Sequence, residues 1–248
     1  MWPYPKIIAH RGGGSLAPEN TLAAMQCGLN RGFHAVEFDV MLTKDLVPVL
    51  LHDEKLGRTV AGQGQVSEML AQDLFQLEAG SWFAPEFAGC RVPSYTQVLE
   101  FCAKNEIWMN VEIKPAAGFD TLTGKITGEI TRDFYQKNTQ FNAPLPLFSS
   151  FSLDALAAVK LAAPLIPRAV LFDQIPANWH EHLRALDAVA LHTNQQHLTA
   201  TLAHEIKQAG YGLSCYTVNE IARAHELLSW GVDALFTDRL DLIGADFT

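Results

Sequence analysis

The sequence predicts a (β/α)8 TIM barrel, because its length, composition and alternating patterns agree. The chain has 248 residues, which fits one large domain or two small ones. Its hydrophobic content is 48% and its charged content only 18%, so a substantial core is expected and disorder is not. Eight strand-like runs alternate with helical patterns, which suits one barrel better than two domains. An open doubly wound sheet is the alternative, but no G-x-G-x-x-G follows the first run.

The eight predicted strands are short apolar runs spread evenly along the chain. They are Ile7–His10, Ala35–Val40, Trp108–Lys114, Pro146–Ser150, Arg168–Phe172, Ala188–His192, Gly212–Tyr216 and Ala234–Thr237. Continuous apolar runs of this length are typical of parallel strands that are covered on both faces.

Helical patterns lie between most of these runs. Ser94, with Gln97 three residues later, predicts a capping box at the start of a helix. Ser152 and Asn219 are predicted to cap two later helices. Apolar residues at four-residue spacing predict a further helix with one buried face: Leu122, Ile126, Ile130 and Phe134.

One stretch after the second strand interrupts the alternation. Only six residues separate Ala35–Val40 from the apolar Val47–His52, whereas a parallel crossover needs a dozen or more. We therefore expect a hairpin that turns at Lys44-Asp45 and places His52 opposite Glu37, or opposite Asp39 after a slip of two residues. Residues 54–93 are expected to form a small insertion over one barrel end, within one catalytic domain spanning residues 1–248.

Acidic side chains gather where the second and third strands end. Glu37 and Asp39 are two residues apart and share one face, and Glu112 occupies the same kind of position on the next strand. Three carboxylates inside an apolar wall cannot all stay ionised without a cation. Oxygen ligands suit a hard divalent ion, so one Mg²⁺ is the first expectation and Ca²⁺, Mn²⁺ or Co²⁺ are the alternatives. Simple ion pairs with Arg11 or Lys114 are the reading without a metal.

Several motifs in this chain resemble one known family. They stand in order along the chain: His10-Arg11-Gly12, Ala17-Pro18-Glu19-Asn20-Thr21, Glu37-Phe38-Asp39-Val40, the Lys44-Asp45 turn, His52-Asp53, Glu112-Ile113-Lys114, Ser149-Ser150-Phe151, Tyr216-Thr217-Val218-Asn219, Gly231-Val232-Asp233 and Thr237-Asp238. This order and spacing resemble the glycerophosphodiester phosphodiesterases, particularly their bacterial cytosolic members. Two departures are Leu46, where the family's turn usually has Gly, and Tyr216, where many members have Trp.

The resemblance implies metal-dependent hydrolysis of glycerophosphodiesters, such as glycerophosphocholine or glycerophosphoethanolamine, to sn-glycerol 3-phosphate and an alcohol. It implies site roles in three groups: Glu37, Asp39 and Glu112 as metal ligands, Arg11 and Lys114 as phosphate-binding cations, and His10 and His52 as general acid and base. Imidazole suits that role because it titrates near neutral pH. The sequence leaves open which histidine is the base, and whether a glycerol hydroxyl or water attacks first.

Other polar and aromatic residues have weaker claims to the site. Asp238 is expected to position Lys114 or Arg11, and His192 and Asn194 are candidates for the pocket wall. Helix capping and loop support are equally compatible with Glu19 and Asn20. Core packing is the simpler interpretation of the aromatic candidates: Trp82, Phe83 and Phe151.

The charge balance restricts the possible partners. A net charge of −9, with no lysine or arginine cluster, argues against nucleic acid and against membrane insertion. A small-molecule substrate is therefore expected, and nothing in the sequence indicates a particular oligomeric state. The first six residues show no export signal, so a cytoplasmic protein is expected. The alternatives are a related barrel phospholipase acting on intact lipids and a non-catalytic barrel that binds a phosphorylated metabolite.

Overall fold

Eight parallel strands close into a barrel in the computed structural model, which describes residues 2–141 and 143–248. They are β1 (Ile7–Ala9), β2 (Ala35–Leu42), β4 (Trp108–Ile113), β5 (Leu147–Ser150), β6 (Arg168–Phe172), β7 (Ala190–Asn194), β8 (Gly212–Tyr216) and β9 (Ala234–Thr237). Neighbouring strands pair in parallel around the ring, and the pairing of β1 with both β9 and β2 closes it. The chain is therefore a (β/α)8 TIM barrel, as predicted.

The predicted strands agree closely with the observed ones. The fifth, seventh and eighth predictions have the observed bounds, and most others differ by one or two residues at an end. The largest shift is at β7, which begins at Ala190 and ends at Asn194 instead of running from Ala188 to His192. Two polar residues therefore continue the strand towards the carboxyl end of the barrel.

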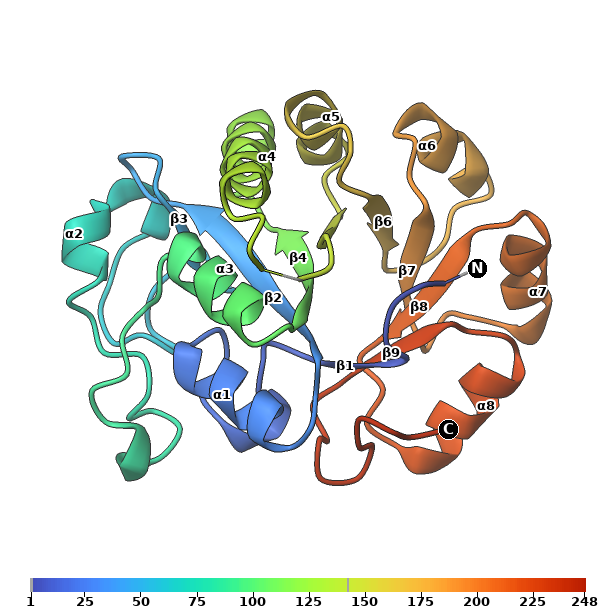
Figure 1. Ribbon diagram of the computed structural model, residues 1–248, viewed down its shortest axis with the longest axis horizontal. Helices are drawn as coiled ribbons and strands as arrows, with labels where there is room; N and C mark the ends of the chain where they lie inside the picture. Colours follow the sequence, from blue (N-terminus) through green and yellow to red (C-terminus); the bar gives the residue numbers. More distant parts are fainter. Residues whose placement is uncertain (1, 142) are drawn as a thin grey trace.

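Helices cover the outside of the barrel (Figure 1). They are α1 (Leu22–Asn30), α2 (Ala71–Leu74), α3 (Tyr95–Lys104), α4 (Asp120–Lys137), α5 (Leu153–Ala162), α6 (Trp179–Ala185), α7 (Ala200–Gln208) and α8 (Ile221–Ser229), with short 3-10 turns at Gly14–Leu16, Val66–Glu68 and Pro85–Phe87. The capping box of Ser94 and Gln97 is present, and the Ser152 hydroxyl caps α5. None of the described helices combines the length and the apolar character that crossing a membrane requires.

The predicted buried face of α4 is wrong. Leu122 is 43% exposed, whereas the buried face consists mainly of small and threonine side chains, among them Gly124, Gly128 and Thr131. A Cβ atom on Gly124 would lie 2.1 Å from the carbonyl oxygen of Ala155 in α5. The close approach of α4 to α5 therefore selects the glycine face, which hydrophobic periodicity alone does not identify.

The predicted hairpin is present, but both predicted registers are wrong. Strand β3 (Pro48–Leu50) pairs antiparallel with β2, with Val40 opposite Leu50, which is one residue away from either expected register. The cause is a three-residue turn in which Leu46 adopts a left-handed conformation with φ +62°. Three-residue hairpin turns commonly end on such a residue, usually glycine. Leu46, the departure noted in the sequence, is therefore the residue that sets the register.

Residues 54–93 lie beside the hairpin and pack on it. Val60, Val66 and Leu74 form an apolar cluster with Met41 of β2 and Val49 of β3. In Figure 1 this segment runs outside α1 and α3, near the end of the hairpin. The insertion therefore has its own small core but shares it with the barrel wall.

The amino end of the barrel interior is closed by apolar side chains. Small residues of several strands, such as Ala35, Ala190 and Ala234, surround the indole of Trp108. Tyr4 stacks on Trp108 at a centroid distance of 4.4 Å, and Trp2 packs against both rings. Inward-facing side chains alternate along each strand, so polar residues two or four positions further along face the carboxyl end.

Candidate active site

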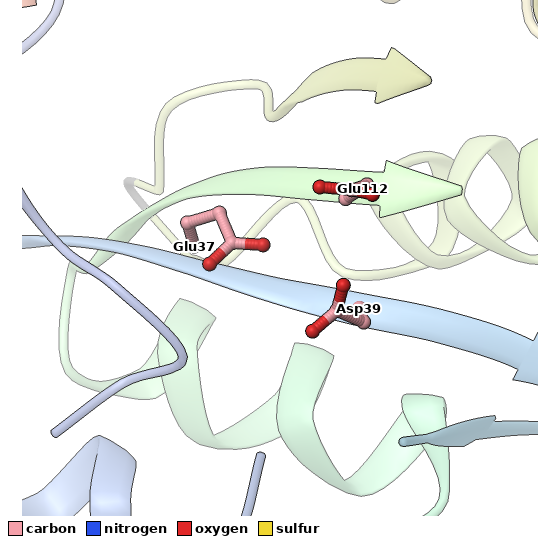
Figure 2. A group of neighbouring side chains, drawn as sticks. All are labelled: Glu37, Asp39 and Glu112. Carbon is pink, nitrogen blue, oxygen red and sulfur yellow. The ribbon is translucent and has the colours of Figure 1, made fainter. Parts of the chain in front are cut away.

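Three carboxylates meet inside the carboxyl end of the barrel (Figure 2). Glu37 and Asp39 project from β2, and Glu112 projects from the adjacent β4, where it pairs in register with Asp39. One oxygen from each side chain lies within 4.8 Å of the other two. Glu37 is 3% exposed and Asp39 is 1% exposed, so water screens their repulsion poorly.

The charge states of this cluster reflect that crowding. Burial, followed by repulsion from Asp39, raises the pKa of Glu37 to about 7. Burial and the charges of Asp39 and Glu37 raise the pKa of Glu112 well above its ordinary value. Burial also acts to raise the pKa of Asp39, but the positive charges of Arg11 and Lys114 outweigh it and lower that pKa.

The donor set fits a hard divalent cation. Oε1 of Glu37 is buried and has no hydrogen-bond partner among the described residues. Two ligands on opposite sides of Mg²⁺ or Ca²⁺ are about 4–5 Å apart, which is comparable with the spacing of these oxygens. The same three residues form the one group of this kind found in the described part of the chain. Glu37, Asp39 and Glu112 could therefore hold one ion together.

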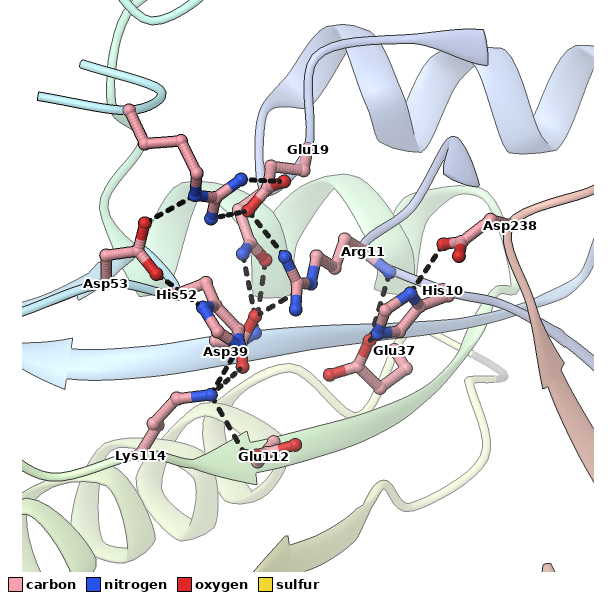
Figure 3. A network of polar contacts seen from close by, with 12 residues as sticks. His10, Arg11, Glu19, Glu37, Asp39, His52, Asp53, Glu112, Lys114 and Asp238 are labelled. Carbon is pink, nitrogen blue, oxygen red and sulfur yellow. Dashed lines mark hydrogen bonds and ion pairs between the residues drawn. The ribbon is translucent and has the colours of Figure 1, made fainter. Parts of the chain in front are cut away.

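His10 stands beside this cluster at the end of β1 (Figure 3). Its Nδ1 lies 2.6 Å from Oδ1 of Asp238, and its Nε2 lies 3.8 Å from Oε2 of Glu37. Burial lowers the pKa of His10, but Asp238 and Glu37 raise it by more, so the net pKa lies above its ordinary value. Asp238 was expected to position Lys114 or Arg11; the structure places it on His10 instead.

Asp238 is itself held by Asn219. The amide nitrogen of Asn219 donates to Oδ2 of Asp238 at 3.0 Å, and its amide oxygen accepts from the backbone N–H of Asp238 at 2.8 Å. The predicted capping role of Asn219 is wrong, because Glu220 precedes α8 and caps it without a side-chain bond. A residue that looked like a helix cap therefore supports the aspartate that orients His10.

His52 reaches the site from the hairpin arm, just beyond β3. Nζ of Lys114 lies 2.5 Å from its Nε2, and its Nδ1 lies 2.7 Å from Oδ1 of Asp53. An ammonium group has only donors, so Nε2 of His52 accepts and its Nδ1–H donates to Asp53. Burial is the main cause of a lowered pKa at His52. Lys114 also lies 3.7 Å from Asp39 and 3.8 Å from Glu112, which links this histidine to the carboxylates.

Arg11 lies on the other side of Asp39. Its Nη1 donates to Glu19 at 2.7 Å, and its Nε is 3.6 Å from Oδ2 of Asp39. The amide nitrogen of Asn20 donates to the same Asp39 oxygen at 2.8 Å. Thr21, not Glu19 or Asn20, caps α1. Glu19 and Asn20 therefore support the site, and the helix-capping interpretation of both residues is wrong.

Arg58 was absent from the sequence-based site. This residue of the insertion donates to both carboxylate oxygens of Glu19 at 2.7 and 2.8 Å and to Oδ2 of Asp53 at 2.5 Å. It thus connects the carboxylate that holds Arg11 with the carboxylate that holds His52. Its place five residues after Asp53 was the available signal, but the insertion had been given no role in the site.

All seven predicted site residues line one pocket of about 230 Å³. The remaining lining residues are Asn110, Phe151, Leu171, His192, Tyr216, Thr217 and Phe236. The rings of Phe151 and Tyr216 meet edge to face at 6.0 Å and form an aromatic wall. Asn194 is not among the lining residues, whereas Trp82 and Phe83 line a neighbouring recess beside His10 and Arg11.

The fold and the site together define a barrel hydrolase whose acidic, histidine-containing pocket suits a phosphate ester. The chain matches the model of the glycerophosphoryl diester phosphodiesterase family over residues 10–242, and it belongs to that family. It is a glycerophosphodiester phosphodiesterase, as the resemblance implied.

Similar proteins support this assignment along nearly the whole chain. A putative glycerophosphodiester phosphodiesterase of Bacillus subtilis strain 168 is 32% identical, with 97% of each chain covered. A glycerophosphodiester phosphodiesterase of Caldanaerobacter subterraneus is also 32% identical, covering 94% of this chain and 93% of the relative. The structure of an Oleispira antarctica phosphodiesterase in complex with the product sn-glycerol-3-phosphate superposes with a TM-score of 0.88 at 36% identity, covering 94% and 93% of the two chains.

Proposed function

We propose that this enzyme hydrolyses glycerophosphodiesters such as glycerophosphocholine and glycerophosphoethanolamine to sn-glycerol 3-phosphate and an alcohol, with one divalent cation, Mg²⁺ first. The observation that carries this proposal is the buried cluster of Glu37, Asp39 and Glu112 at the wall of the pocket. The Oleispira antarctica phosphodiesterase, with sn-glycerol-3-phosphate bound as its product, supports the choice of product.

Electrostatics explains how an acidic chain accepts a phosphodiester. In the transition state of phosphoryl transfer, negative charge spreads over the equatorial oxygens. The cation, when bound, would neutralise part of that charge as a Lewis acid. With Arg11 and Lys114 against three carboxylates, the pocket then carries roughly +1 before the histidines are counted. The local charge of the pocket is thus opposite to that of the whole chain.

Two histidines line the pocket and are assigned the proton transfers. His10 is oriented by Asp238, and His52 is oriented by Asp53 and Lys114. In both rings Nδ1 faces a carboxylate, which leaves Nε2 directed towards the other site residues. One imidazole removes a proton from the attacking hydroxyl and the other protonates the leaving alcohol, contributing about 10²–10⁴-fold each.

The direct test measures glycerol 3-phosphate released from glycerophosphocholine by the purified, chelator-treated protein. We expect no turnover until Mg²⁺ is added, with Ca²⁺, Mn²⁺ and Co²⁺ tested in parallel. Absence of turnover with all four ions would contradict the proposal. Full activity in the presence of chelator would contradict its metal dependence. Vesicles of intact phosphatidylcholine serve as the comparison substrate, and faster release from them would favour a phospholipase.

A further inference from the structure

A second set of polar side chains lies one layer below the carboxylates, towards the amino end of the barrel. Asn110 precedes Glu112 by two residues on β4, and His192 and Ser214 are register partners on β7 and β8. His192 and Ser214 are completely buried, and Asn110 is 1% exposed. Polar groups this deep in a barrel interior normally have hydrogen-bond partners.

These groups lack such partners among the described residues. Both ring nitrogens of His192, Oγ of Ser214 and Oδ1 of Asn110 are unpaired. The amide nitrogen of Asn110 donates to Oγ of Ser149 at 2.9 Å, so only its oxygen is free. Each buried polar group without a partner costs about 1–3 kcal/mol. The arrangement therefore offers several unused hydrogen bonds in one place.

The chemistry of His192 narrows what it can bind. Burial lowers its pKa to about 3, so the ring is neutral and has one donor and one acceptor nitrogen. Below it the barrel is closed by Trp2, whose ring centroid is 6.5 Å away, and Phe236 packs at 5.1 Å. His192 and Asn110 line the same pocket as the predicted catalytic residues. The open side of this layer is therefore the substrate pocket.

We propose that His192 and Asn110 form a hydroxyl-binding floor that holds the glycerol half of the substrate; this inference rests on the proposed function. A hydroxyl both donates and accepts, which matches a neutral imidazole and an amide oxygen. Leu171 and Phe236 line the same floor and offer apolar contact to the glycerol carbons.

The shape of the pocket indicates which half of the substrate lies there. Glycerol is common to all glycerophosphodiesters, whereas the alcohol varies in size. A closed floor suits the constant half, and the variable half needs the open mouth, where Phe151 is 49% exposed. The phosphate, attached directly to glycerol, would then lie one layer higher beside Arg11 and Lys114.

The test compares two ligands that share a phosphate and differ in hydroxyls. Calorimetry would measure the binding of glycerol 3-phosphate and of n-propyl phosphate to the protein in Mg²⁺. We expect His192→Phe to weaken the binding of glycerol 3-phosphate about three- to tenfold, the size of one or two net hydrogen bonds, and to leave n-propyl phosphate unchanged. His192→Gln, which keeps a donor and an acceptor, should retain part of the preference.

The control is His204→Phe, because His204 is exposed on α7 and should affect neither ligand. An equal loss for both ligands, or no change for either, would overturn the proposal and leave the floor as a site for water. If His192→Phe fails to fold, Asn110→Ala gives the same comparison of ligands. Binding needs no turnover, so an inactive wild type that keeps the His192-dependent preference contradicts the proposed function alone.

Discussion

The two ends of the barrel interior differ although the same strands build both. At the amino end, Ala35 and Trp108 belong to an apolar layer that Tyr4 stacks against. At the carboxyl end, only two to four residues further along the same strands, Glu37 and Glu112 crowd together with raised pKa values. Stability therefore resides at the closed end, and the charged end is a source of strain that ligands can relieve. Substitutions at each end test this division.

The largest effect is expected at the charged end. Glu37→Gln, Asp39→Asn and Glu112→Gln should each weaken Mg²⁺ binding and reduce kcat/KM by about 10³-fold or more, since a bound cation supplies several kcal/mol. Calorimetric titration with Mg²⁺ and release of glycerol 3-phosphate are the measurements. Glu100→Gln, at an exposed position of α3, is the matched control. Unchanged metal affinity in all three variants would refute the ligand assignment.

The same substitution should change how stability depends on pH. The pKa of Glu37 rises from 4.5 to about 7 on folding, mainly through burial. The unfolded chain then loses its proton first, so this group destabilises the metal-free fold as pH rises through that interval. Thermal melting in chelator should show a smaller loss of stability between pH 4.5 and 7 for Glu37→Gln than for the wild type. An identical loss would contradict the raised pKa.

The histidine substitutions come next in size. His10→Ala and His52→Ala should reduce kcat by about 10²–10⁴-fold while Mg²⁺ affinity is retained. The p-nitrophenyl ester of glycerol phosphate has a leaving group that needs no acid. We expect one of the two variants to regain most of its activity on that ester, which identifies the general acid. Equal impairment of both variants on both substrates would argue against the division of roles.

At the closed end, Trp108→Ala should act on stability. Loss of this buried indole should lower the free energy of unfolding by about 3–5 kcal/mol, measured by urea denaturation. Because the ring packs below the site, kcat of the folded protein should change little. Trp82→Ala, on a side chain that is 42% exposed, should change stability by about 0.5 kcal/mol or less. A large loss of kcat in Trp108→Ala would show that the two ends are coupled.

The smallest effect concerns Arg58, which touches neither end directly. Arg58→Lys keeps the charge but cannot hold Glu19 and Asp53 at the same time. We expect kcat/KM to fall about tenfold, because charge-assisted hydrogen bonds contribute about 1.5–3 kcal/mol and part of this is retained. Mg²⁺ affinity should not change. Arg184→Lys on the exposed side of α6 is the control, and an equal effect there would remove the positioning role.

The candidate site was largely readable from the sequence. His10, Glu37, Asp39 and Glu112 were predicted together because strand periodicity and the carboxyl-end rule place them on one face. The supporting contacts were not readable in this way. Asp238 contacts His10 across 228 residues of sequence, and that contact exists only because β9 closes the barrel against β1.

The sequence by itself determined the barrel class, the order of its strands and the residues at their ends, because these depend on local composition and on the two-residue period of a strand. The tertiary structure decided the rest. Leu46 set the hairpin register through its backbone conformation, and the glycine face of α4 was selected by the approach of α5. The bridge through Arg58 and the unpaired nitrogens of His192 likewise depend on which side chains packing brings within hydrogen-bond distance.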